Sequence, residues 1–252
     1  MSTNLIDVHC HINFFKNAGD IALECEKTKT HTVYVTTSPS QFDETFEYVK
    51  ELKYIYPSLG FHCLESYYNL DDEKKIFLKN IDKTKFIGEV GLDFSKRASK
   101  SKIEQLELFQ FVLELIKGKE KILNLHSASA EDEVLEMIVK YGIKKAMFHW
   151  YSGKIGTLKK IIDYGYYISI NDAMCKSKKG QNIISKLPKD KVLVETDAPF
   201  IEGVLPYNNY YVYQYLADIW NIKYVDVVKI VFNNFIKIQK NTNKSNLLDY
   251  TT

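Results

Sequence analysis

Cysteine is scarce in this chain of 252 residues, and its copies follow none of the spacings that define a structural class. No Cys-x-x-Cys pair occurs, and the density lies far below that of a disulfide-stabilised scaffold. We therefore expect free thiols in a reducing compartment. The cysteines concerned are Cys10, Cys25, Cys63 and Cys175.

Long hydrophobic runs are also missing. The N-terminus has no basic stretch followed by an apolar one, and no segment reaches the roughly 18 unbroken apolar residues that would cross a bilayer. We expect a soluble cytoplasmic protein with no membrane partner.

An excess of charge of one sign is absent as well, since 34 basic residues face 32 acidic ones and the net charge is +2. This balance lacks the strong excess of basic residues that would by itself indicate a nucleic-acid-binding protein. Proline occurs five times, and neither a Gly/Ser-rich linker nor a repeat of 20–50 residues is visible. These absences predict a single domain over residues 1–252, with 240–252 as a flexible tail.

Short β-rich runs alternate with longer segments of helical periodicity along the whole chain, which is the pattern of repeated βα units. One amphipathic stretch is Ile103–Ile116, and another, about Tyr224–Lys240, is expected to cover the barrel as a last helix. Eight strands and a length of about 250 residues predict a TIM-type (β/α)8 barrel of the α/β class. The expected strands are Leu5–Cys10, Thr32–Thr36, Ser58–His62, Phe86–Val90, Ile122–His126, Lys145–His149, Tyr166–Ile170 and Val192–Thr196.

Metal-type ligands stand at the ends of five of these strands. His9 and His11 point to the same side of the first strand, and catalytic groups of such barrels gather at the C-terminal ends of strands. Buried imidazoles and carboxylates are costly unless paired or coordinated, so we expect a cation among them. The candidate ligands are His9, His11, Glu89, His126, His149 and Asp197.

The ligand set suits two ions better than one. Two ions about 3.5–4 Å apart, bridged by a carboxylate, would use all six side chains and leave positions open for water. Glu89 is the candidate bridge. Because imidazoles and carboxylates suit several metals, the ions could be Mg, Mn or Zn.

The sequence resembles the TatD family of metal-dependent deoxyribonucleases, within the amidohydrolase barrel superfamily. The similarity covers most of the chain. It is carried by D-x-H-x-H at Asp7–His11, G-x-H at Gly60–His62, I-G-E-x-G-L-D at Ile87–Asp93, Q-x-x-x-F at Gln105–Phe109, H-S at His126–Ser127, H-x-x-S-G at His149–Gly153 and E-T-D-A-P at Glu195–Pro199.

The resemblance implies that His9, His11 and Asp197 hold one ion, that His126 and His149 hold a second, and that Glu89 lies between the two ions. It also implies a catalytic histidine at His62, with Glu89 and Asp197 as further catalytic groups. His31 matches no motif and stands at the start of a strand, so we expect a structural role for it.

The sequence departs from the family at two places. Cys63 follows the third-strand motif where Pro is usual, and Ala128 stands where the family has Arg in H-S-R-x-A. Without this arginine the motif lacks a guanidinium group suited to bind phosphate, so the departure bears on phosphate binding more than on metal binding. Trp150-Tyr151 and Thr36–Ser40 resemble divergent TatD-like nucleases of bacterial anti-phage (Qat) operons, which implies defence-complex proteins as partners.

We expect a deoxyribonuclease of exonuclease type that cleaves phosphodiester bonds by metal-activated water, with single-stranded DNA or frayed ends as substrate. Asp197 could accept a proton from that water, while Asp7 and Glu195 could orient the ligands. Terminal bases could stack on aromatic side chains at the strand ends. Those considered are Trp150, Tyr151, Phe14 and Phe15.

Two other classes of function would use the same barrel. One is an amidohydrolase or esterase of small molecules, or a deacylase of aminoacyl-tRNA. The other is a non-catalytic TatD-like subunit of a defence complex, which the missing arginine favours and the intact ligands oppose. Fold alone cannot choose between these substrates.

Overall fold

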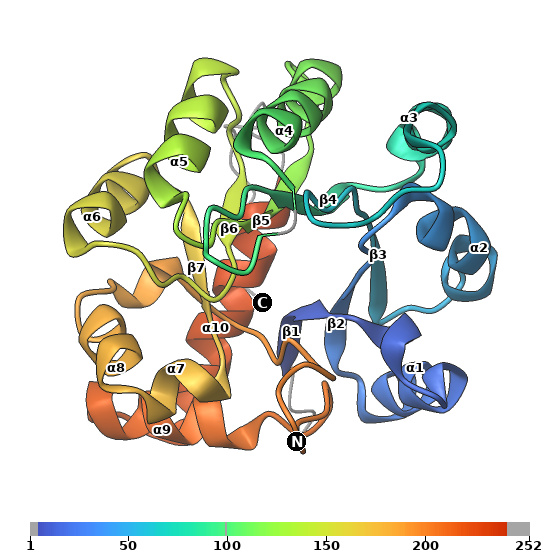
Figure 1. The fold of residues 1–252 in the computed structure, drawn as a ribbon. Helices are drawn as coiled ribbons and strands as arrows, with labels where there is room; N and C mark the ends of the chain where they lie inside the picture. The colour runs from blue at the N-terminus through green and yellow to red at the C-terminus, as the bar shows by residue number, and fades with distance from the viewer. Residues whose placement is uncertain (1–4, 99, 241–252) are drawn as a thin grey trace.

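Eight parallel strands form the centre of the chain in the computed structural model, which describes residues 5–98 and 100–240. Each strand pairs with the next along the chain, so spatial order follows sequence order. Figure 1 shows the strands at the centre and the helices around them. The strands are β1 (Ile6–Cys10), β2 (His31–Val35), β3 (Ile55–Leu59), β4 (Phe86–Gly91), β5 (Ile122–His126), β6 (Ala146–Phe148), β7 (Tyr167–Ile170) and β8 (Val192–Val194).

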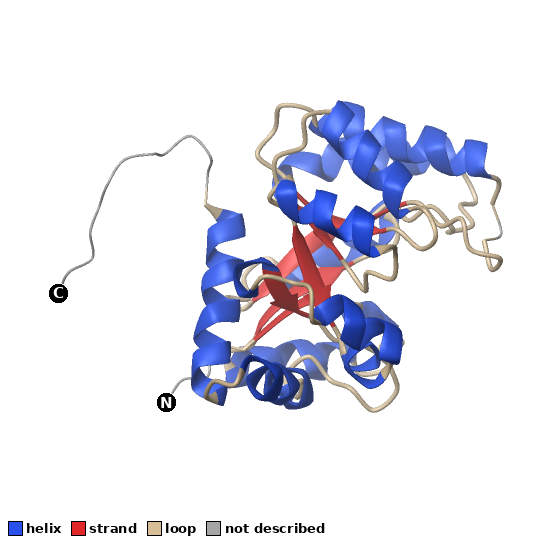
Figure 2. Ribbon diagram, turned by 90° about the vertical axis from the view of Figure 1, so that its left-hand side faces the viewer, coloured by secondary structure: helices blue, strands red, loops and turns tan. Residues whose placement is uncertain are grey.

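Helices connect the strands and cover the outside of the sheet, as the side view in Figure 2 also shows. This arrangement confirms the predicted α/β barrel of TIM type. The α-helices are α1 (Ala18–Thr28), α2 (Pro39–Val49), α3 (Leu70–Asn80), α4 (Lys102–Ile116), α5 (Glu131–Lys140), α6 (Ile155–Asp163), α7 (Asp172–Lys176), α8 (Lys178–Ile184), α9 (Tyr210–Trp220) and α10 (Tyr224–Gln239). Short 3-10 helices span Ile12–Phe14, Ile81–Lys83 and Lys189–Lys191.

Local sequence signals explain where several helices begin. Ser101 and Glu104 form a reciprocal capping box at the start of α4, which satisfies backbone N–H groups that have no partner within the helix. Ser38 caps α2 by accepting a hydrogen bond from the backbone N–H of Gln41, and Pro39 follows it at a position where no N–H donor is needed. These caps fix the points at which the chain leaves the barrel end and turns back along its outside.

The barrel closes between β8 and β1 through a side chain rather than a regular ladder. Asp7 is fully buried and accepts a hydrogen bond from the backbone N–H of Thr196 at 2.9 Å and another from its hydroxyl. Beyond this point the N–H of Asp197 donates to the carbonyl of His9 at 2.9 Å. Asp7 therefore holds two strand ends together just below the predicted ligands.

Helix α10 covers the N-terminal end of the barrel. The sequence predicts a last helix that covers the barrel. The ring of Phe235 lies 5.4 Å from that of Tyr56 and 6.3 Å from that of Phe86, both at the start of strands. His31 begins β2 in the same aromatic layer, and its Nδ1 lies 2.7 Å from the hydroxyl of Tyr56. The expectation that His31 is structural agrees with this packing.

One predicted strand was displaced. The sequence predicts the third strand over Ser58–His62. In the structure β3 spans Ile55–Leu59, with Pro57 inside it and paired with Tyr34. His62 consequently lies in the loop after β3. The alternation of side chains along a strand therefore does not set the direction of its ring. The tail predicted at 240–252 falls, after Lys240, outside the described residues.

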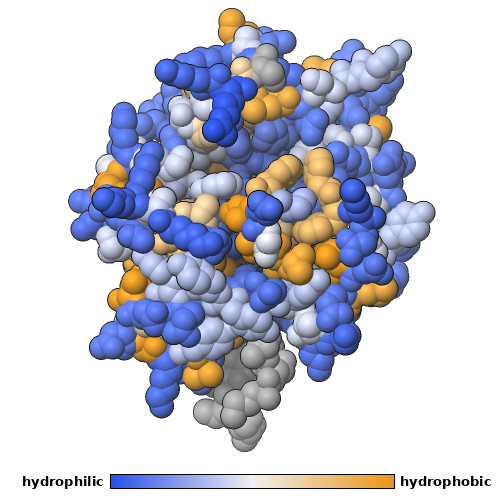
Figure 3. Space-filling model, turned by 60° about the horizontal axis from the view of Figure 1, so that its bottom comes forward, coloured by the Kyte–Doolittle hydropathy of each residue, from blue (hydrophilic) through white to orange (hydrophobic). Residues whose placement is uncertain are grey.

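The surface in Figure 3 is mainly hydrophilic, with apolar side chains gathered near the middle of the face shown. Large apolar side chains that are exposed include Leu23 of α1 and Tyr48 of α2, which line one pocket between these helices. Among the described residues, no helix combines the length and the apolar character that a membrane crossing requires.

All four cysteines are free and buried, and burial raises the pKa of each thiol. A buried, protonated thiol is a poor nucleophile. We expect Ellman's reagent to label fewer than about one thiol in the native protein and all four in guanidinium chloride. Rapid labelling of two or more thiols under native conditions would contradict this packing.

Candidate metal centre

The six predicted ligands converge at the C-terminal end of the barrel. Because the strands are parallel, the ends of all of them meet at the same rim. His9 lies within β1, Glu89 lies within β4, and His126 ends β5. His11 and His149 follow directly after β1 and β6, and Asp197 is the third residue after β8. The side chains brought together are His9, His11, Glu89, His126, His149 and Asp197.

Glu89 lies at the centre of the cluster, and its two oxygens face different histidines. Oε1 is 2.8 Å from Nδ1 of His126 and 3.0 Å from Nε2 of His149. Oε2 is 3.4 Å from Nε2 of His11 and 3.7 Å from Nε2 of His9. The carboxylate therefore separates the histidines into two groups, one on each oxygen.

Asp197 belongs to the group on Oε2. Its Oδ1 lies 3.6 Å from Nε2 of His11 and 3.7 Å from Nε2 of His9. Burial raises the pKa of Asp197 to about 6 and lowers that of His11 to about 4. The imidazole of His11 is thus neutral at pH 7 and can offer a lone pair to a cation.

The hydrogen bonds of His9 show that a cation fits between these groups. Nδ2 of Asn124 donates to the carbonyl of Val8, so its Oδ1, 2.8 Å from Nδ1 of His9, is an acceptor. His9 must then carry its proton on Nδ1 and point the lone pair of Nε2 at Nε2 of His11, 3.0 Å away. Neutral imidazoles and carboxylates facing one another in a dry lumen are stabilised when a cation lies among them.

Groups of three ligand atoms within 4.8 Å of one another occur three times in the part of the chain that the structure describes. Two of these groups share Glu89, one with His9 and His11 and the other with His62 and His126. Burial opposes ionisation of Glu89, but the neighbouring imidazoles of His62 and His149 and hydrogen bonds from His11 and His126 outweigh it and hold the pKa of Glu89 well below its usual range.

His62 reaches the cluster from its loop. Nε2 lies 3.4 Å from Oε1 of Glu89, and its ring is 4.8 Å from that of His126. Two hydrogen bonds hold the residue, because its backbone N–H donates to the carbonyl of Thr37 at 2.8 Å and its Nδ1 accepts from the N–H of Leu64 at 3.2 Å. The free nitrogen of His62 thus faces the metal centre from the open side.

Glu195 supports the cluster from within the barrel. Its carboxylate accepts hydrogen bonds from the backbone of Trp150 and from the side chains of Ser169 and Asn171. Oε1 also lies 3.7 Å from Nδ1 of His149. Three fixed donors leave the carboxylate little freedom, so it holds the imidazole of His149 in position.

Sequence reasoning missed two residues that fix ligands. Asn124 holds His9 as described, and Asp93 places Oδ2 3.0 Å from Nε2 of His126. Signals for both were present, since Asn124 precedes His126 by two positions on the same face of β5 and Asp93 ends the I-G-E-x-G-L-D motif. A carboxylate on the far nitrogen of a ligating histidine sets its tautomer and raises its basicity.

The backbone turns sharply where two strands deliver their ligands. Trp150, directly after His149, and Asp197 have left-handed φ values of 40° and 52°. Gly91 has a φ of 138°, and a Cβ there would lie 2.0 Å from the carbonyl oxygen of His126. Only glycine therefore allows β4 and β5 to approach closely enough to share the cluster.

Comparison with known proteins settles the family. Residues 6–240 match the model of the family described as TatD related DNase. The chain belongs to this family. Human deoxyribonuclease TATDN3 is 25% identical over 258 residues, covering 93% of this chain and 94% of the relative.

Two further comparisons agree. An uncharacterized metal-dependent hydrolase of Bacillus subtilis, YabD, is 23% identical over 248 residues, covering 91% of this chain and 96% of its own. The crystal structure of YjjV, a TatD homologue from Escherichia coli K12, superposes with a TM-score of 0.85 at 21% identity, over 94% of this chain and 98% of that one. The latter likeness shows the fold.

An open pocket of about 410 Å³ lies over the metal centre of this TatD-family chain. Phe14, Trp150 and Phe200 form apolar parts of its wall, and their exposed fractions are 43%, 38% and 58%. The ring of Phe14 lies 5.3 Å from that of Phe200, a residue that the sequence did not single out. These rings offer flat apolar surfaces beside the ligands.

The expected substrate contact at Tyr151 was wrong. Tyr151 is 1% exposed, packs in the core and donates its hydroxyl to the carbonyl of Lys154 at 2.7 Å. The left-handed turn at Trp150 sends the next side chain inward, so only Trp150 of the pair faces the pocket. Phe15, also considered, packs against a second apolar cluster and does not line this pocket.

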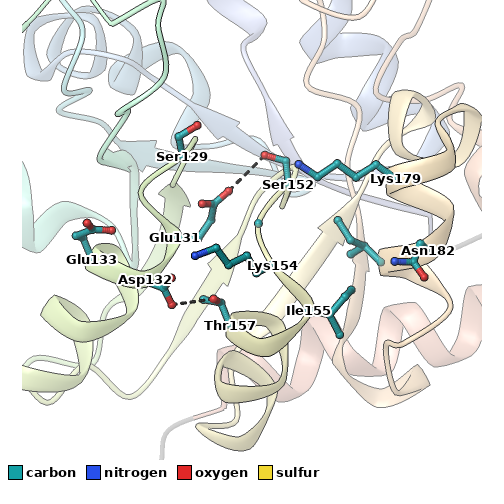
Figure 4. A pocket seen from close by; sticks show the side chains of 12 residues that line it. Ser129, Glu131, Asp132, Glu133, Ser152, Lys154, Ile155, Thr157, Lys179 and Asn182 are labelled. Atoms are coloured by element: carbon teal, nitrogen blue, oxygen red, sulfur yellow. Dashed lines mark hydrogen bonds between the residues drawn. The ribbon is translucent and has the colours of Figure 1, made fainter.

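A larger cavity, about 670 Å³, lies to one side among α5, α6 and α8 (Figure 4). Asp132 and Thr157 are hydrogen-bonded across it at 2.7 Å, and Glu131 approaches Ser152 at 3.4 Å. It contains none of the six ligands. Size therefore does not identify the reactive site, and the chemistry belongs to the smaller pocket.

Proposed function

We propose that this protein is a divalent-metal-dependent deoxyribonuclease that hydrolyses phosphodiester bonds. The observation that carries the proposal is the carboxylate of Glu89, whose two oxygens face two separate groups of histidines. The names of relatives support it, because one is a deoxyribonuclease and another a metal-dependent hydrolase.

The two groups correspond to two ion positions. His9, His11 and Asp197 would hold one ion with Oε2 of Glu89, and His126 and His149 would hold the other with Oε1. When bound, two such ions lower the pKa of water and neutralise charge on the phosphate oxygens. Nitrogen and carboxylate donors without thiolate suit Mg, Mn or Zn.

The side chains of the protein supply orientation and proton transfer. Asp197 faces the pocket, and its carboxylate would accept a proton from the attacking water. His62 presents Nε2 from the open side, within reach of a phosphate held over Glu89. Asn124, Asp93 and the residues that hold them keep the ligands in fixed tautomers.

Trp150 is the proposed platform for a terminal base. Stacking of a base on an aromatic ring contributes about 1–3 kcal/mol, so we expect Trp150→Ala to raise KM for a single-stranded oligonucleotide roughly 5- to 150-fold. The value of kcat should change little, because Trp150 contacts no ligand of the cluster through its ring. Steady-state digestion of end-labelled oligonucleotides measures both constants.

The matched control is Tyr48→Ala, which removes an aromatic ring that is 82% exposed on α2 and lies outside this pocket. It should leave KM unchanged. If Trp150→Ala also left KM unchanged, the proposal that a terminal base stacks on Trp150 would be wrong.

Turnover on a panel of substrates tests the proposed function against its alternatives. Metal-loaded protein should digest DNA and leave small amides, small esters and aminoacyl-tRNA intact. Preferential turnover of a small ester or of aminoacyl-tRNA would show that the site acts on those substrates instead of DNA. Bound metal with no turnover of any substrate would favour a non-catalytic subunit of a defence complex. Exonuclease action, a preference for frayed ends, a cytoplasmic location and defence-complex partners stay predictions of the sequence.

A further inference from the structure

Arg97 is the one arginine in the sequence, against 33 lysines. It lies in the loop between β4 and α4 and is exposed. There it lines a pocket of about 310 Å³ together with His126, His149 and Trp150. These three residues also line the pocket over the metal centre, so the two pockets adjoin each other.

The loop that carries Arg97 is fixed to a metal-ligand candidate by a chain of hydrogen bonds. The backbone N–H of Arg97 donates to Oγ of Ser95 at 3.3 Å, and the N–H of Ser95 donates to Oδ1 of Asp93 at 2.8 Å. The other oxygen of Asp93 lies 3.0 Å from His126. The position of Arg97 is thereby set relative to the reactive site.

The base of the loop is held on two further sides. Gln105 of α4 both donates to the carbonyl of Asp93 and accepts from its N–H, each at 2.7 Å. The N–H of Phe94 donates to the carbonyl of Ala128 at 2.8 Å, which ties the loop to the one after β5. Because the loop backbone is held at three points, the main ordering cost of binding falls on the arginine side chain alone.

The guanidinium group of Arg97 has no polar partner among the described residues of the protein. In the described part of the chain it makes no hydrogen bond and no ion pair, and both oxygens of Asp93, the carboxylate that lines the same pocket, already have partners. Lys100 and Lys102 of the same region lie over the rings of Tyr67 and Phe94. A guanidinium can donate two parallel hydrogen bonds to two oxygens of one phosphate, a geometry that an ammonium group does not offer.

We propose that Arg97 binds a backbone phosphate of the nucleic-acid strand, next to the phosphodiester held at the metal centre. This inference rests on the proposed function, because the phosphodiester chain is the substrate class named there. The strand would extend from the pocket over Glu89, past Trp150, into the space beside Ser95 and Ala128.

The test measures binding separately from hydrolysis. Fluorescence anisotropy of a labelled single-stranded oligonucleotide with phosphorothioate linkages, which resist cleavage, gives Kd for the metal-loaded protein at several salt concentrations. Arg97→Ala should weaken binding roughly tenfold and lower the salt slope by about 0.7. Arg97→Lys should restore the salt slope but only part of the affinity, because the charge returns without the two parallel donors.

Lys96→Ala is the matched control, since Lys96 is the adjacent exposed cation and does not line the pocket. Its Kd should stay within about twofold of the wild type. In digestion of an ordinary oligonucleotide, Arg97→Ala should raise KM about tenfold with kcat preserved and metal content unchanged.

Equal affinities of Arg97→Ala and Lys96→Ala would overturn the inference, and so would loss of bound metal in Arg97→Ala or failure of the wild type to bind the oligonucleotide. Binding that depends on Arg97 without any cleavage of ordinary DNA would instead reject the proposed nuclease and support the phosphate contact.

Discussion

Replacement of Glu89 by glutamine is expected to lower metal-dependent hydrolysis of DNA by roughly 10³-fold or more. Glutamine keeps the shape of the side chain but removes its charge, and its NH₂ group cannot coordinate an ion. One of the two oxygens that face His126 and His11 is thereby lost as a ligand. Steady-state kcat/KM and the metal content by elemental analysis measure the effect.

Glu65→Gln is the control for this change. Glu65 lines the same pocket, but its carboxylate accepts a hydrogen bond from the hydroxyl of Thr37 at 2.6 Å and faces none of the ligand groups. Its activity and metal content should stay near those of the wild type. If Glu89→Gln kept both its metal and its rate, the bridging role of Glu89 would be wrong.

Removal of metal is expected to lower the thermal midpoint, Tm, by about 5–10 °C per ion. An ion present at about 100 times its Kd stabilises the folded state by about 2.7 kcal/mol. A protein of this size changes Tm by about 2–4 °C for each kcal/mol. The physical cause is the buried cluster, in which carboxylates and imidazole lone pairs face one another without a cation.

Differential scanning calorimetry of chelator-treated protein, before and after return of Mn or Zn, measures this shift. His126→Ala should show a smaller shift than the wild type, because it removes one ligand from the Oε1 group. A Tm that stays the same with and without metal would mean that the cluster is stable without an ion.

The barrel could be predicted from the sequence because hydrophobic periodicity and strand order are local signals. The run Ile122–His126 forms β5 with the bounds expected, and the last helix ends within one residue of its prediction. The ligands could be predicted for a related reason. In a parallel barrel all strand ends share one rim, so residues distant in sequence must meet there.

Other parts of the site depend on contacts that no local pattern contains. Tyr151 and Trp150 are adjacent aromatic residues, and only the left-handed turn between strand and loop decides which of them faces the pocket. Phe200 contacts Phe14, although the two residues are far apart in the sequence. Asp93 acts through His126, a pairing that becomes visible only when β4 and β5 are placed side by side.

The measurement that tests the central claim most directly is digestion of end-labelled single-stranded and duplex DNA by metal-stripped protein, with Mg, Mn or Zn returned one at a time. His9→Ala serves as the control, because His9 lies at 0% exposure among the ligands and contributes nothing to the pocket wall. The account predicts product ladders that require the returned metal and disappear in His9→Ala. Digestion that continues without metal, or equally in His9→Ala, would contradict it.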